Sequence, residues 1–396
     1  MNVKNTKSIK SINLKGKRVF LRVDLNIPLK EDGTISDSSR IKAILPTIEY
    51  ALCEGASIIL CSHLGRPVAG SFEHKFSLEP VAKVLETMLK RKVVLLRNWI
   101  SESFGCNVGE IILLENSRFY EWEMQNDYSI AQKISDKFDV YINDAFATAH
   151  RKETTTHQLA LASPVKGYGL LFEKEIQALT RILDQGNAGT IAIVGGAKVS
   201  TKLKLLKTLV KKMDWTVTGG GIANTFLKAS GHEVGGSLYE PECIDDAAEV
   251  IDISKTNGTG LLLPVDFVVS KDSSGENKNE IVDLGAVKRY QMILDFGPKS
   301  IKNIAGVITN ATKILWNGPL GMFEKESFSL GTKRLAQMVA SAEGFTVAGG
   351  GDTLAAINKF ISPKSIDYIS TGGGAFMEFI EKDGNLPAII ALTESG

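Results

Sequence analysis

Basic and hydrogen-bonding side chains follow successive apolar runs in the first half of the chain. Because an arginine guanidinium grips a carboxylate or a phosphate through paired hydrogen bonds, arginines that converge on one edge suit a phosphorylated or carboxylated metabolite. Asp24 and Asn26, at the end of the first run, suit a hydroxyl group. A single arginine of this kind is usually an ordinary surface residue, but repetition after several runs favours a binding site. The residues concerned are Asp24, Asn26, Arg40, His63, Arg66, Arg118, His150 and Arg151.

Glycine-rich turns take the corresponding places in the second half. Such a turn before a helix exposes backbone N–H groups to which a phosphate binds. None of the turns fits G-x-x-x-x-G-K-[ST], which excludes a P-loop protein, and none fits G-x-G-x-x-G, which disfavours a dinucleotide site. One glycine triplet is usually only a tight turn, whereas three after predicted strands indicate nucleotide phosphates. The turns are GGAKVSTK (195–202), TGGGIANTF (218–226), GGGDT (349–353) and TGGGAF (371–376).

Charged residues beside these turns support the same interpretation. Lys198 and Lys202 are spaced i,i+4 at the start of a predicted helix over 199–213 and would share one face. Cations at a helix start oppose the helix dipole unless an anion lies between them and the amide groups. Asp352 follows glycines at a helix start, where it either helps to hold phosphate-bound Mg²⁺ or caps the helix. Glu324 either accepts hydrogen bonds from a ribose or is a surface acid.

The residue types also limit the reaction. The sequence offers no Ser-His-Asp set and no reactive cysteine motif, and His63 and His150 lack the spacing of zinc ligands, so that anion contact or packing is favoured for them. Phosphoryl transfer fits this pattern, because it requires positioning and charge neutralisation rather than a protein nucleophile.

The elements that must position these residues repeat one unit: a short apolar run, a polar or glycine-rich turn, and then usually a helical pattern. Near-continuous apolar runs are typical of parallel strands that are covered on both faces. We therefore predict two doubly wound α/β sheets, with ligands beyond the carboxyl ends of the strands. The predicted strands are 19–26, 57–65, 93–98, 110–116 and 140–146 in the first half, and 190–196, 215–221, 261–269, 313–319, 345–351 and 368–374 in the second.

The length of 396 residues also favours two domains, since one hydrophobic core rarely serves so many. The boundary is expected near 165–188, where SPVKGYG (163–169) reads as a loop and FEKEIQALTRILD (172–184) as one amphipathic helix. The predicted domains are 1–171, an interdomain helix and hinge at 172–187, 188–376, and a terminal segment at 377–396.

Composition excludes several classes of protein. Lys and Arg number 46 against 45 Asp and Glu, and the resulting net charge of +1 argues against a nucleic-acid or membrane-surface coat. The four cysteines form no C-x-x-C pair, which favours reduced thiols in the cytoplasm. The N-terminal stretch lacks the apolar segment of a signal peptide, and no apolar stretch approaches the ~20 residues of a membrane helix.

The sequence resembles the phosphoglycerate kinase family over essentially its full length. Ten motifs appear in the family's order, which is far more specific than any one of them alone. They are RVDLNIP, SHLGRP, ENSRF, NDAFATAHR, GGAKVSTK, GGGIANTFL, LPVDFVV, WNGPLGMFE, AGGGDT and STGGGAF.

The resemblance implies reversible, Mg²⁺-dependent phosphoryl transfer between ATP and the carboxylate of 3-phosphoglycerate, giving 1,3-bisphosphoglycerate and ADP. By matching position, the phosphoglycerate would be bound by Asp24, Asn26, Arg40, His63, Leu64, Gly65, Arg66, Arg118 and Arg151. The nucleotide would be bound by Lys198, Lys202, Gly219, Gly220, Asn317, Glu324, Gly350, Gly351, Asp352 and Thr353, with Asp352 on the Mg²⁺ side. The transferring group would be held by Arg40, Lys198, Lys202, Gly372, Gly373 and Gly374.

The resemblance further implies a monomer that closes about the 172–184 helix and whose residues from about 377 return to the first domain. The chain departs from the family pattern at Ser117, where Leu is common, at Ala147, where Gly is common, and after Arg151, where AHAS is common. Three alternatives stay open: another acyl-phosphate-forming carboxylate kinase, a nicotinamide dehydrogenase, and a non-catalytic binding protein.

Overall fold

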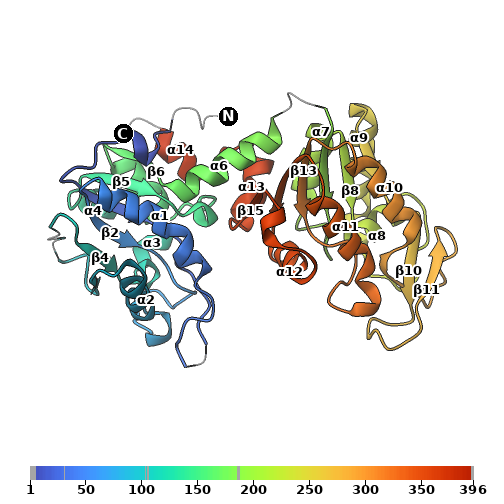
Figure 1. The fold of residues 1–396 in the computed structure, drawn as a ribbon, viewed down its shortest axis with the longest axis horizontal. Helices are drawn as coiled ribbons and strands as arrows, with labels where there is room; N and C mark the ends of the chain where they lie inside the picture. The colour runs from blue at the N-terminus through green and yellow to red at the C-terminus, as the bar shows by residue number, and fades with distance from the viewer. Residues whose placement is uncertain (1–5, 31, 103, 105–106, 185–187, 394–396) are drawn as a thin grey trace. The chain divides into compact units, whose positions relative to one another are not determined.

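The structure is a computed structural model that describes residues 6–30, 32–102, 104, 107–184 and 188–393. The chain divides into two compact units (Figure 1). Unit 1 contains the residues up to Gln177 together with those from Lys382, and unit 2 contains Ala178–Glu381. In the described parts of the chain, no helix combines the length and the apolar character that crossing a membrane requires. The domain limits predicted above from the sequence (1–171, 172–187, 188–376 and 377–396) stay a prediction.

Unit 1 is built on a six-stranded sheet whose neighbouring strands are all parallel. The strand order β3-β4-β2-β1-β5-β6 confirms a doubly wound sheet, because the chain winds to one side of β1 through β2 and to the other through β5. The strands are β1 (Arg18–Arg22), β2 (Ser57–Cys61), β3 (Val93–Leu96), β4 (Ile111–Leu114), β5 (Val140–Asn143) and β6 (Lys166–Tyr168).

Strand β6 corrects one sequence prediction, since SPVKGYG was expected to be a loop. Lys166–Tyr168 pairs in parallel with β5, and Tyr168 N–H donates to the Lys7 carbonyl oxygen at 2.9 Å. Gly167 has to be glycine because a Cβ there would collide with that same carbonyl oxygen. The strand was missed because two glycines and a proline within seven residues hide a strand of three.

Successive side chains of the central strands point to opposite faces of this sheet, and helices cover both faces. On one face Val19, Leu21 and Ile58 pack against α1 (Ser39–Cys53) and α2 (Glu79–Leu89). On the other face Phe20 and Ile59 pack against α4 (Tyr128–Ser135), α5 (Leu159–Ala162) and α14 (Pro387–Thr393). The short helices η4 (Ser117–Phe119) and α3 (Glu121–Gln125) follow β4, and η5 (Phe146–Thr148) and the π-helical η6 (Thr154–Gln158) follow β5. Of these, η6 packs against α4, α5 and α14.

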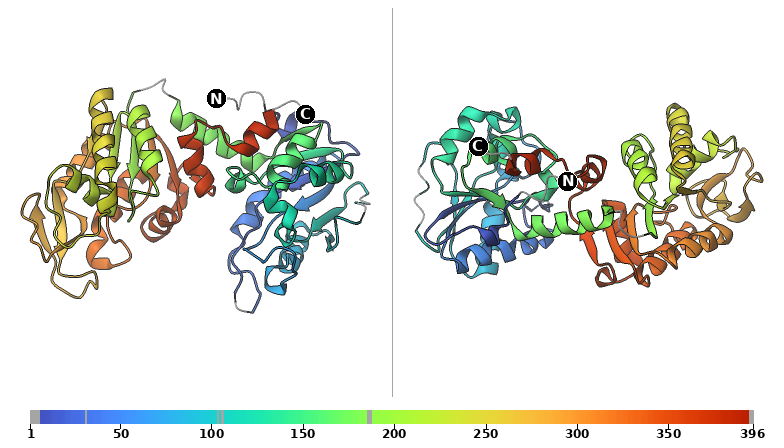
Figure 2. Two further views of the ribbon diagram at one scale, coloured as in Figure 1. Left: turned by 180° about the vertical axis from the view of Figure 1, so that it is seen from behind. Right: turned by 90° about the horizontal axis from the view of Figure 1, so that it is seen from above.

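Helix α14 returns to unit 1 after the whole of unit 2 (Figure 2). Its Ala391 and Leu392 join the core beneath α5, and Ala388 N–H donates to the Ala149 carbonyl oxygen at 3.0 Å. Helix α6 (Leu170–Leu183) makes the outward connection and confirms the helix predicted over 172–184. The division between the units falls within α6, at Gln177 and Ala178.

Unit 2 repeats the plan with a second six-stranded parallel sheet in the order β15-β14-β13-β7-β8-β9. Ile191, Ile314 and Trp316 pack on one face against α10 (Pro298–Ile308), α11 (Leu330–Ala340) and α12 (Gly351–Phe360). The remaining helices are α7 (Leu203–Lys212), α8 (Gly220–Ala229), α9 (Ile244–Asn257) and α13 (Gly374–Glu381), of which α7 packs against α9 and α13. The strands are β7 (Thr190–Val194), β8 (Trp215–Thr218), β9 (Gly260–Leu262), β13 (Lys313–Asn317), β14 (Phe345–Gly349) and β15 (Tyr368–Ser370).

Two sequence predictions for unit 2 need correction. The run 261–269 is not one strand: it divides around Pro264 into β9 and β10 (Asp266–Ser270), since proline cannot donate to a ladder. Strand β10 belongs to a small antiparallel sheet with β11 (Glu280–Asp283) and β12 (Met292–Phe296), neither of which was predicted. Helix α7 begins at Leu203 rather than at 199, so Lys198 and Lys202 do not share a helical face.

Candidate functional site

The side chains predicted to bind an acceptor gather at the carboxyl edge of the unit 1 sheet. They follow β1, β2, β4 and β5, which are neighbours in the sheet, and the winding direction changes at β1. Ligands of open α/β sheets bind at such a change of direction. The fold therefore brings together residues that lie more than a hundred positions apart in the chain.

Hydrogen bonds tie the loops after β1 and β2 to each other. Asp24 Oδ2 accepts from Arg40 Nη1 at 2.6 Å, and Asp24 Oδ1 accepts from the backbone N–H of Asn26 at 3.1 Å. Asn26 Oδ1 accepts from the backbone N–H of Gly65 at 2.8 Å. Arg40 remains 36% exposed at its side chain. The carboxylate thus presents a guanidinium that is oriented but still accessible.

Gly65 has to be glycine, for two reasons. Its φ of +62° lies in the left-handed region, and a Cβ there would collide with the Phe76 ring. Its carbonyl oxygen accepts from Arg118 Nη1 at 2.9 Å. The side chain of the neighbouring Leu64 is buried, its N–H donates to Asn116 Oδ1 at 3.2 Å, and its carbonyl oxygen accepts from Asn116 Nδ2 at 2.7 Å.

His63 is a packed, neutral residue. Its Nδ1 lies 3.4 Å from Arg22 Nη2, and the ring is almost fully buried. Burial first, and then the surrounding arginines, hold the pKa of His63 well below its usual range. The ring can offer a hydrogen bond to a ligand, whereas the positive charge of the edge comes from the arginines.

An acid lies among these arginines that the sequence prediction missed. Glu153 Oε1 accepts from Arg118 Nη2 at 2.7 Å and lies 3.6 Å from Arg151 Nη1. Glu153 Oε2 lies 3.9 Å from Arg22 Nη2. Glu153 is only 2% exposed, whereas Arg66, in the loop after β2, is exposed. One buried carboxylate therefore contacts three guanidinium groups.

Arg22 and Glu123 form a second, deeper layer that was also missed. The fully buried Arg22 donates from Nε to Thr155 Oγ1 at 2.9 Å, and this hydroxyl donates to Glu123 Oε1 at 2.6 Å. Ser117 Oγ donates to the same carboxyl oxygen at 3.3 Å. Burial raises the pKa of Glu123, and Arg22 opposes that rise. An arginine inside the apolar run VFLRV was the sequence signal for this layer, because charged side chains are rarely fully buried unless they are paired.

At the carboxyl edge of the unit 2 sheet the groups are mostly backbone. After β7, a Cβ on Gly195 would overlap the Pro319 carbonyl oxygen, so the turn after β7 lies directly against the turn after β13. After β8, Gly219 and Gly220 begin α8, and Gly220 N–H donates to the Leu320 carbonyl oxygen at 2.8 Å. These close approaches explain why glycine recurs there.

A cavity of about 490 Å³ opens beside these turns. Its wall is largely apolar, with Leu238, Leu320 and Met322, and Glu324 and Asp352 also line it. An apolar pocket with a few polar groups at its margin suits a flat heterocycle attached to a charged tail. The glycines that line it are Gly196, Gly220, Gly221 and Gly321.

Asp295 is a further cavity residue that the sequence prediction missed. It is buried, and its Oδ2 accepts from the backbone N–H of Gly331 at 2.6 Å. Burial raises the pKa of Asp295 to about 7. Gly321 and Gly331 leave no room for a Cβ beside its carboxyl group. The residue thus links β12, the loop after β13 and the start of α11.

Lys202 points back to the sheet edge. Its Nζ donates to the Gly195 carbonyl oxygen at 2.7 Å and to the Asn317 carbonyl oxygen at 3.2 Å. Burial lowers the pKa of Lys202 to about 8, and Asp352 opposes that shift. Lys198 instead lies exposed in the turn before α7. The two lysine side chains therefore lie in different surroundings, Lys202 against the sheet edge and Lys198 in solvent.

Asn317 and Thr353 join the loops after β13 and β14. Asn317 Nδ2 donates to the Gly349 carbonyl oxygen at 2.7 Å. Thr353 Oγ1 donates to the same oxygen at 2.8 Å and accepts from Gly318 N–H at 2.7 Å. Both side chains thus hold the loops, and Gly350, with φ of +97°, supplies the turn into α12.

Asp352 is the candidate metal residue. It lies exposed in the first turn of α12, whose N-cap is Gly350, so the alternative that Asp352 is the N-cap is wrong. In the described residues, no three His, Cys, Asp or Glu side chains are grouped so as to hold a metal ion. One carboxylate fits a Mg²⁺ ion that is bound mainly through nucleotide phosphates.

The last glycine turn follows β15. Gly372 N–H donates to Ser370 Oγ at 3.1 Å, Gly373 has φ of +52°, and Gly374 begins α13. Gly373 and Gly374 are exposed. Their amide groups lie at the start of an eight-residue helix, which is a favourable position for a negative charge.

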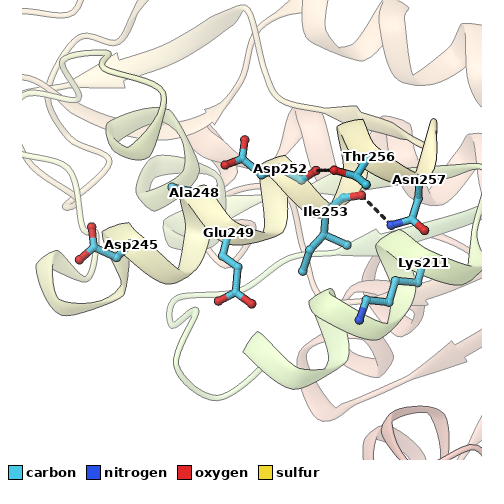
Figure 3. A pocket seen from close by; sticks show the side chains of 8 residues that line it. All are labelled: Lys211, Asp245, Ala248, Glu249, Asp252, Ile253, Thr256 and Asn257. Carbon is cyan, nitrogen blue, oxygen red and sulfur yellow. Dashed lines mark hydrogen bonds between the residues drawn. The ribbon is translucent and has the colours of Figure 1, made fainter.

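A hollow on the surface of α7 and α9 differs in charge from the two sheet edges (Figure 3). Asp245, Glu249 and Asp252 give it acidic walls, and Lys211 lines it from α7. Lys207, one turn before Lys211, pairs with Glu249 at 2.7 Å. The predicted site residues do not line this hollow, and its acidic walls disfavour phosphate ligands.

One basic edge and one glycine-lined edge are features that fit the class of phosphotransferases. The sequence profile of the family described as phosphoglycerate kinase matches residues 9–383. The phosphoglycerate kinases of Francisella philomiragia and of Francisella tularensis subsp. novicida are 44% and 45% identical over 387 residues, covering 98% of each chain.

Solved structures agree with this match. The structure of phosphoglycerate kinase from Coxiella burnetii has a TM-score of 0.95 at 42% identity and covers 98% of this chain and 99% of its own. The enzyme from Pyrococcus horikoshii has a TM-score of 0.79 at 33% identity, covering 97% and 98%. The chain belongs to the phosphoglycerate kinase family, and its activity is phosphoryl transfer to a carboxylate. The predicted resemblance is thereby confirmed, and another carboxylate kinase is not favoured.

Proposed function

We propose that this chain transfers a phosphoryl group reversibly between MgATP and the carboxylate of 3-phosphoglycerate, with the acceptor on unit 1 and the nucleotide on unit 2. The observation that carries the proposal is the complementary chemistry of two similar sheets. One edge presents an arginine cluster, and the other presents glycine turns beside an apolar cavity.

The acceptor has three groups to be held. Arg66, Arg118 and Arg151 suit the distal phosphate, because guanidinium groups bind phosphate oxygens in pairs. Asp24 and Asn26 suit the hydroxyl group. His63 and the backbone at Leu64 and Gly65 complete this proposed site. Arg40, held by Asp24 at 2.6 Å, would face the carboxylate that reacts.

The nucleotide would place its base in the cavity beside Gly219 and Gly220 and its ribose near Glu324. Its phosphates would meet the turn at Gly350 and Gly351, which Asn317 and Thr353 hold in place. Asp352 would contact Mg²⁺. When bound, Mg²⁺ neutralises charge on the phosphates.

The acceptor carboxylate is already an anion, so no general base is required. The protein has to reduce the repulsion between two negative reactants and align them. We assign this role to Arg40, Lys198, Lys202 and the amide groups of Gly372, Gly373 and Gly374. Because the two sets of residues belong to different units, we expect residues 172–187 to act as a hinge between domains 1–171 and 188–376, with 377–396 returning to the first domain.

We also propose a monomeric, cytoplasmic enzyme without nucleic-acid or membrane partners. Each set of proposed ligand residues lies within this one chain. The net charge of +1 argues against a polyanionic partner.

The test is release of ADP from MgATP by the purified chain with and without 3-phosphoglycerate, while a coupling enzyme removes the acyl phosphate. Release that depends on 3-phosphoglycerate supports the proposal. Equal release with and without it, or none from a folded protein, contradicts it. Lys202→Met is a matched control for contaminating kinases, since it should abolish most of the activity.

A further inference from the structure

Lys198, which we assign to the transferring phosphoryl group, lies exposed in the turn after β7. A lysine side chain is long and flexible, so the position of its ammonium group depends on how firmly the backbone beneath it is held. Val199, the next residue, is buried, and its carbonyl oxygen accepts from Lys202 N–H at 2.8 Å. The Lys198 carbonyl oxygen accepts from Thr201 Oγ1 at 3.0 Å. The turn is therefore ordered around an exposed lysine.

Glu240 holds this turn from a distant part of the chain. Its Oε2 accepts from the backbone N–H of Ser200 at 2.8 Å, and its Oε1 accepts from Ser200 Oγ at 2.6 Å. Glu240 is the N-cap residue of the short helix η7 (Pro241–Cys243), yet both of its carboxyl oxygens accept from a residue 40 positions earlier. The carboxylate thus binds a backbone group and a side chain of the same turn residue.

The backbone of Glu240 is in turn joined to α8. Glu240 N–H donates to Thr225 Oγ1 at 3.1 Å, and this hydroxyl donates to the Gly221 carbonyl oxygen at 2.9 Å. Gly221 and Ala197 both line the apolar cavity, and a Cβ on Gly221 would collide with the Ala197 carbonyl oxygen. Glu240 therefore ties the turn that carries Lys198 to the helix beside the proposed base site.

The carboxylate of Glu240 is ionised in these surroundings. Burial raises the pKa of Glu240, but the hydrogen bonds from Ser200 and the nearby charge of Lys198 outweigh burial and hold this pKa below its usual value. Two hydrogen bonds from one residue to an ionised acceptor restrict that residue more than a single neutral bond would.

We propose that Glu240 is a positioning residue for phosphoryl transfer, which holds Ser200 so that Lys198 meets the transferring group. This inference rests on the proposed function. Glu240 acts through the turn and not on the reacting atoms, because both of its carboxyl oxygens already accept from Ser200. A displaced Lys198 would weaken the stabilisation of charge in the transition state, so kcat should respond more than either KM.

Glu240→Ala removes both hydrogen bonds to Ser200. We expect kcat to fall about 20–100-fold, since a misplacement of about 1 Å can cost about 10²-fold, and either KM to change less than about threefold. Glu240→Gln is the conservative variant, because its amide oxygen can still accept from Ser200 N–H, and it should stay within about fivefold of wild type. Glu242→Ala, which removes an exposed acid of η7, is the matched control and should leave kcat unchanged.

A double-mutant cycle measures whether the effect passes through Lys198. In Lys198→Ala the group that Glu240 positions is gone, so adding Glu240→Ala should lower kcat by less than about twofold further. A merely structural role would lower kcat by the same factor in both backgrounds. Steady-state kinetics with both substrates and the Tm of each variant give the comparison.

An unchanged kcat in Glu240→Ala, equal losses in the two backgrounds, or a Glu240→Gln as slow as Glu240→Ala would each overturn the proposal. If Glu240→Ala does not fold, Ser200→Ala replaces it, because Ser200 is exposed and its hydroxyl makes the 2.6 Å hydrogen bond. This variant should lower kcat about three- to tenfold, again only when Lys198 is present; an unchanged kcat would contradict the inference. A wild-type chain without phosphoglycerate-dependent turnover would contradict the proposed function and this inference together, whereas the other failures contradict this inference alone.

Discussion

The two parallel sheets place different groups at their carboxyl edges. In unit 1 these are long side chains that pair with one another, as Asp24 does with Arg40 and Glu153 does with Arg118. In unit 2 they are backbone groups at glycines, and Gly195 lies directly against the Pro319 carbonyl group. The same fold thus presents two kinds of edge: in unit 1 the dense positive charge is paired with internal acids, and in unit 2 the close approach of backbone requires the absence of side chains.

The difference determines what a substitution can do. At the edge of unit 1, a change alters charge and leaves the backbone in place, so binding and turnover should respond more than folding. At the edge of unit 2, even one methyl group displaces backbone, so folding and binding should change together.

Arg40→Ala should have the largest effect, and it tests whether unit 1 contributes to the chemical step. We expect kcat to fall by about 10²–10³-fold, as when one preorganised donor to a transition-state charge is removed, with smaller changes in either KM. Steady-state kinetics with both substrates measures this. Lys42→Ala, an exposed residue of the same helix, is the control; an unchanged kcat in Arg40→Ala would exclude a catalytic role.

Gly195→Ala tests the backbone edge. The added Cβ would overlap the Pro319 carbonyl oxygen, and overpacking costs about 1–3 kcal/mol of unfolding free energy. We expect a lower Tm and a raised KM for ATP, with the KM for phosphoglycerate unchanged. Gly306→Ala in α10, where a Cβ meets no atom within 4 Å, is the matched control and should not lower the Tm. A loss of phosphoglycerate binding alone would contradict the assignment of the nucleotide to unit 2.

Arg66→Ala tests whether phosphoglycerate binds to unit 1. It removes an exposed guanidinium, and we expect the KM for phosphoglycerate to rise about tenfold. The KM for ATP should stay within about twofold of wild type, since Arg66 belongs to unit 1. A selective effect on ATP would invert the assignment.

The smallest predicted effect concerns the proton on Lys202. Because burial lowers the pKa of Lys202 to about 8, about half of these amines are neutral at pH 8 in the free protein. Nucleotide phosphates would raise that pKa, so MgATP binding at pH 8 should take up as much as about half a proton, and little at pH 6. Calorimetry in buffers of different ionisation enthalpy measures the uptake, which should disappear in Lys202→Met.

The same lowered pKa affects stability in a defined direction. The unfolded lysine, with its normal pKa, takes up its proton at a higher pH than the folded one. Its contribution should therefore lower the stability of the free protein as pH falls from about 10.5 to about 8.

Much of this fold could be predicted from sequence, because parallel strands buried on both faces leave long apolar runs such as SIILC. Strand β6 could not, since three residues with a central glycine carry no periodicity. The single run 261–269 concealed two strands because only Pro264 marks the division. The gathering of charged residues at the edge of unit 1 could be predicted because these residues follow strands, which is a local signal.

The partners of these residues could not be predicted in the same way. Glu153 reads as an ordinary acid between Lys152 and Thr154, and only the fold places it against Arg118, 35 positions away. Likewise, helix α7 begins at Leu203, so the relation between Lys198 and Lys202 depends on a turn and not on helical periodicity. Pairing between distant segments is a property of the topology.

The return of α14 to unit 1 has a consequence for synthesis of the protein. Ala391 and Leu392 complete a core that also contains Leu159 and Ala160, yet all of Ala178–Glu381 is translated in between. At about 5–20 residues per second, the first stretch waits roughly 10–40 s on the ribosome for its last helix. Unit 2 is contiguous and can finish folding during that interval. The unit whose translation begins first is therefore the second to be completed, and its apolar surface beside α5 needs protection from aggregation until then.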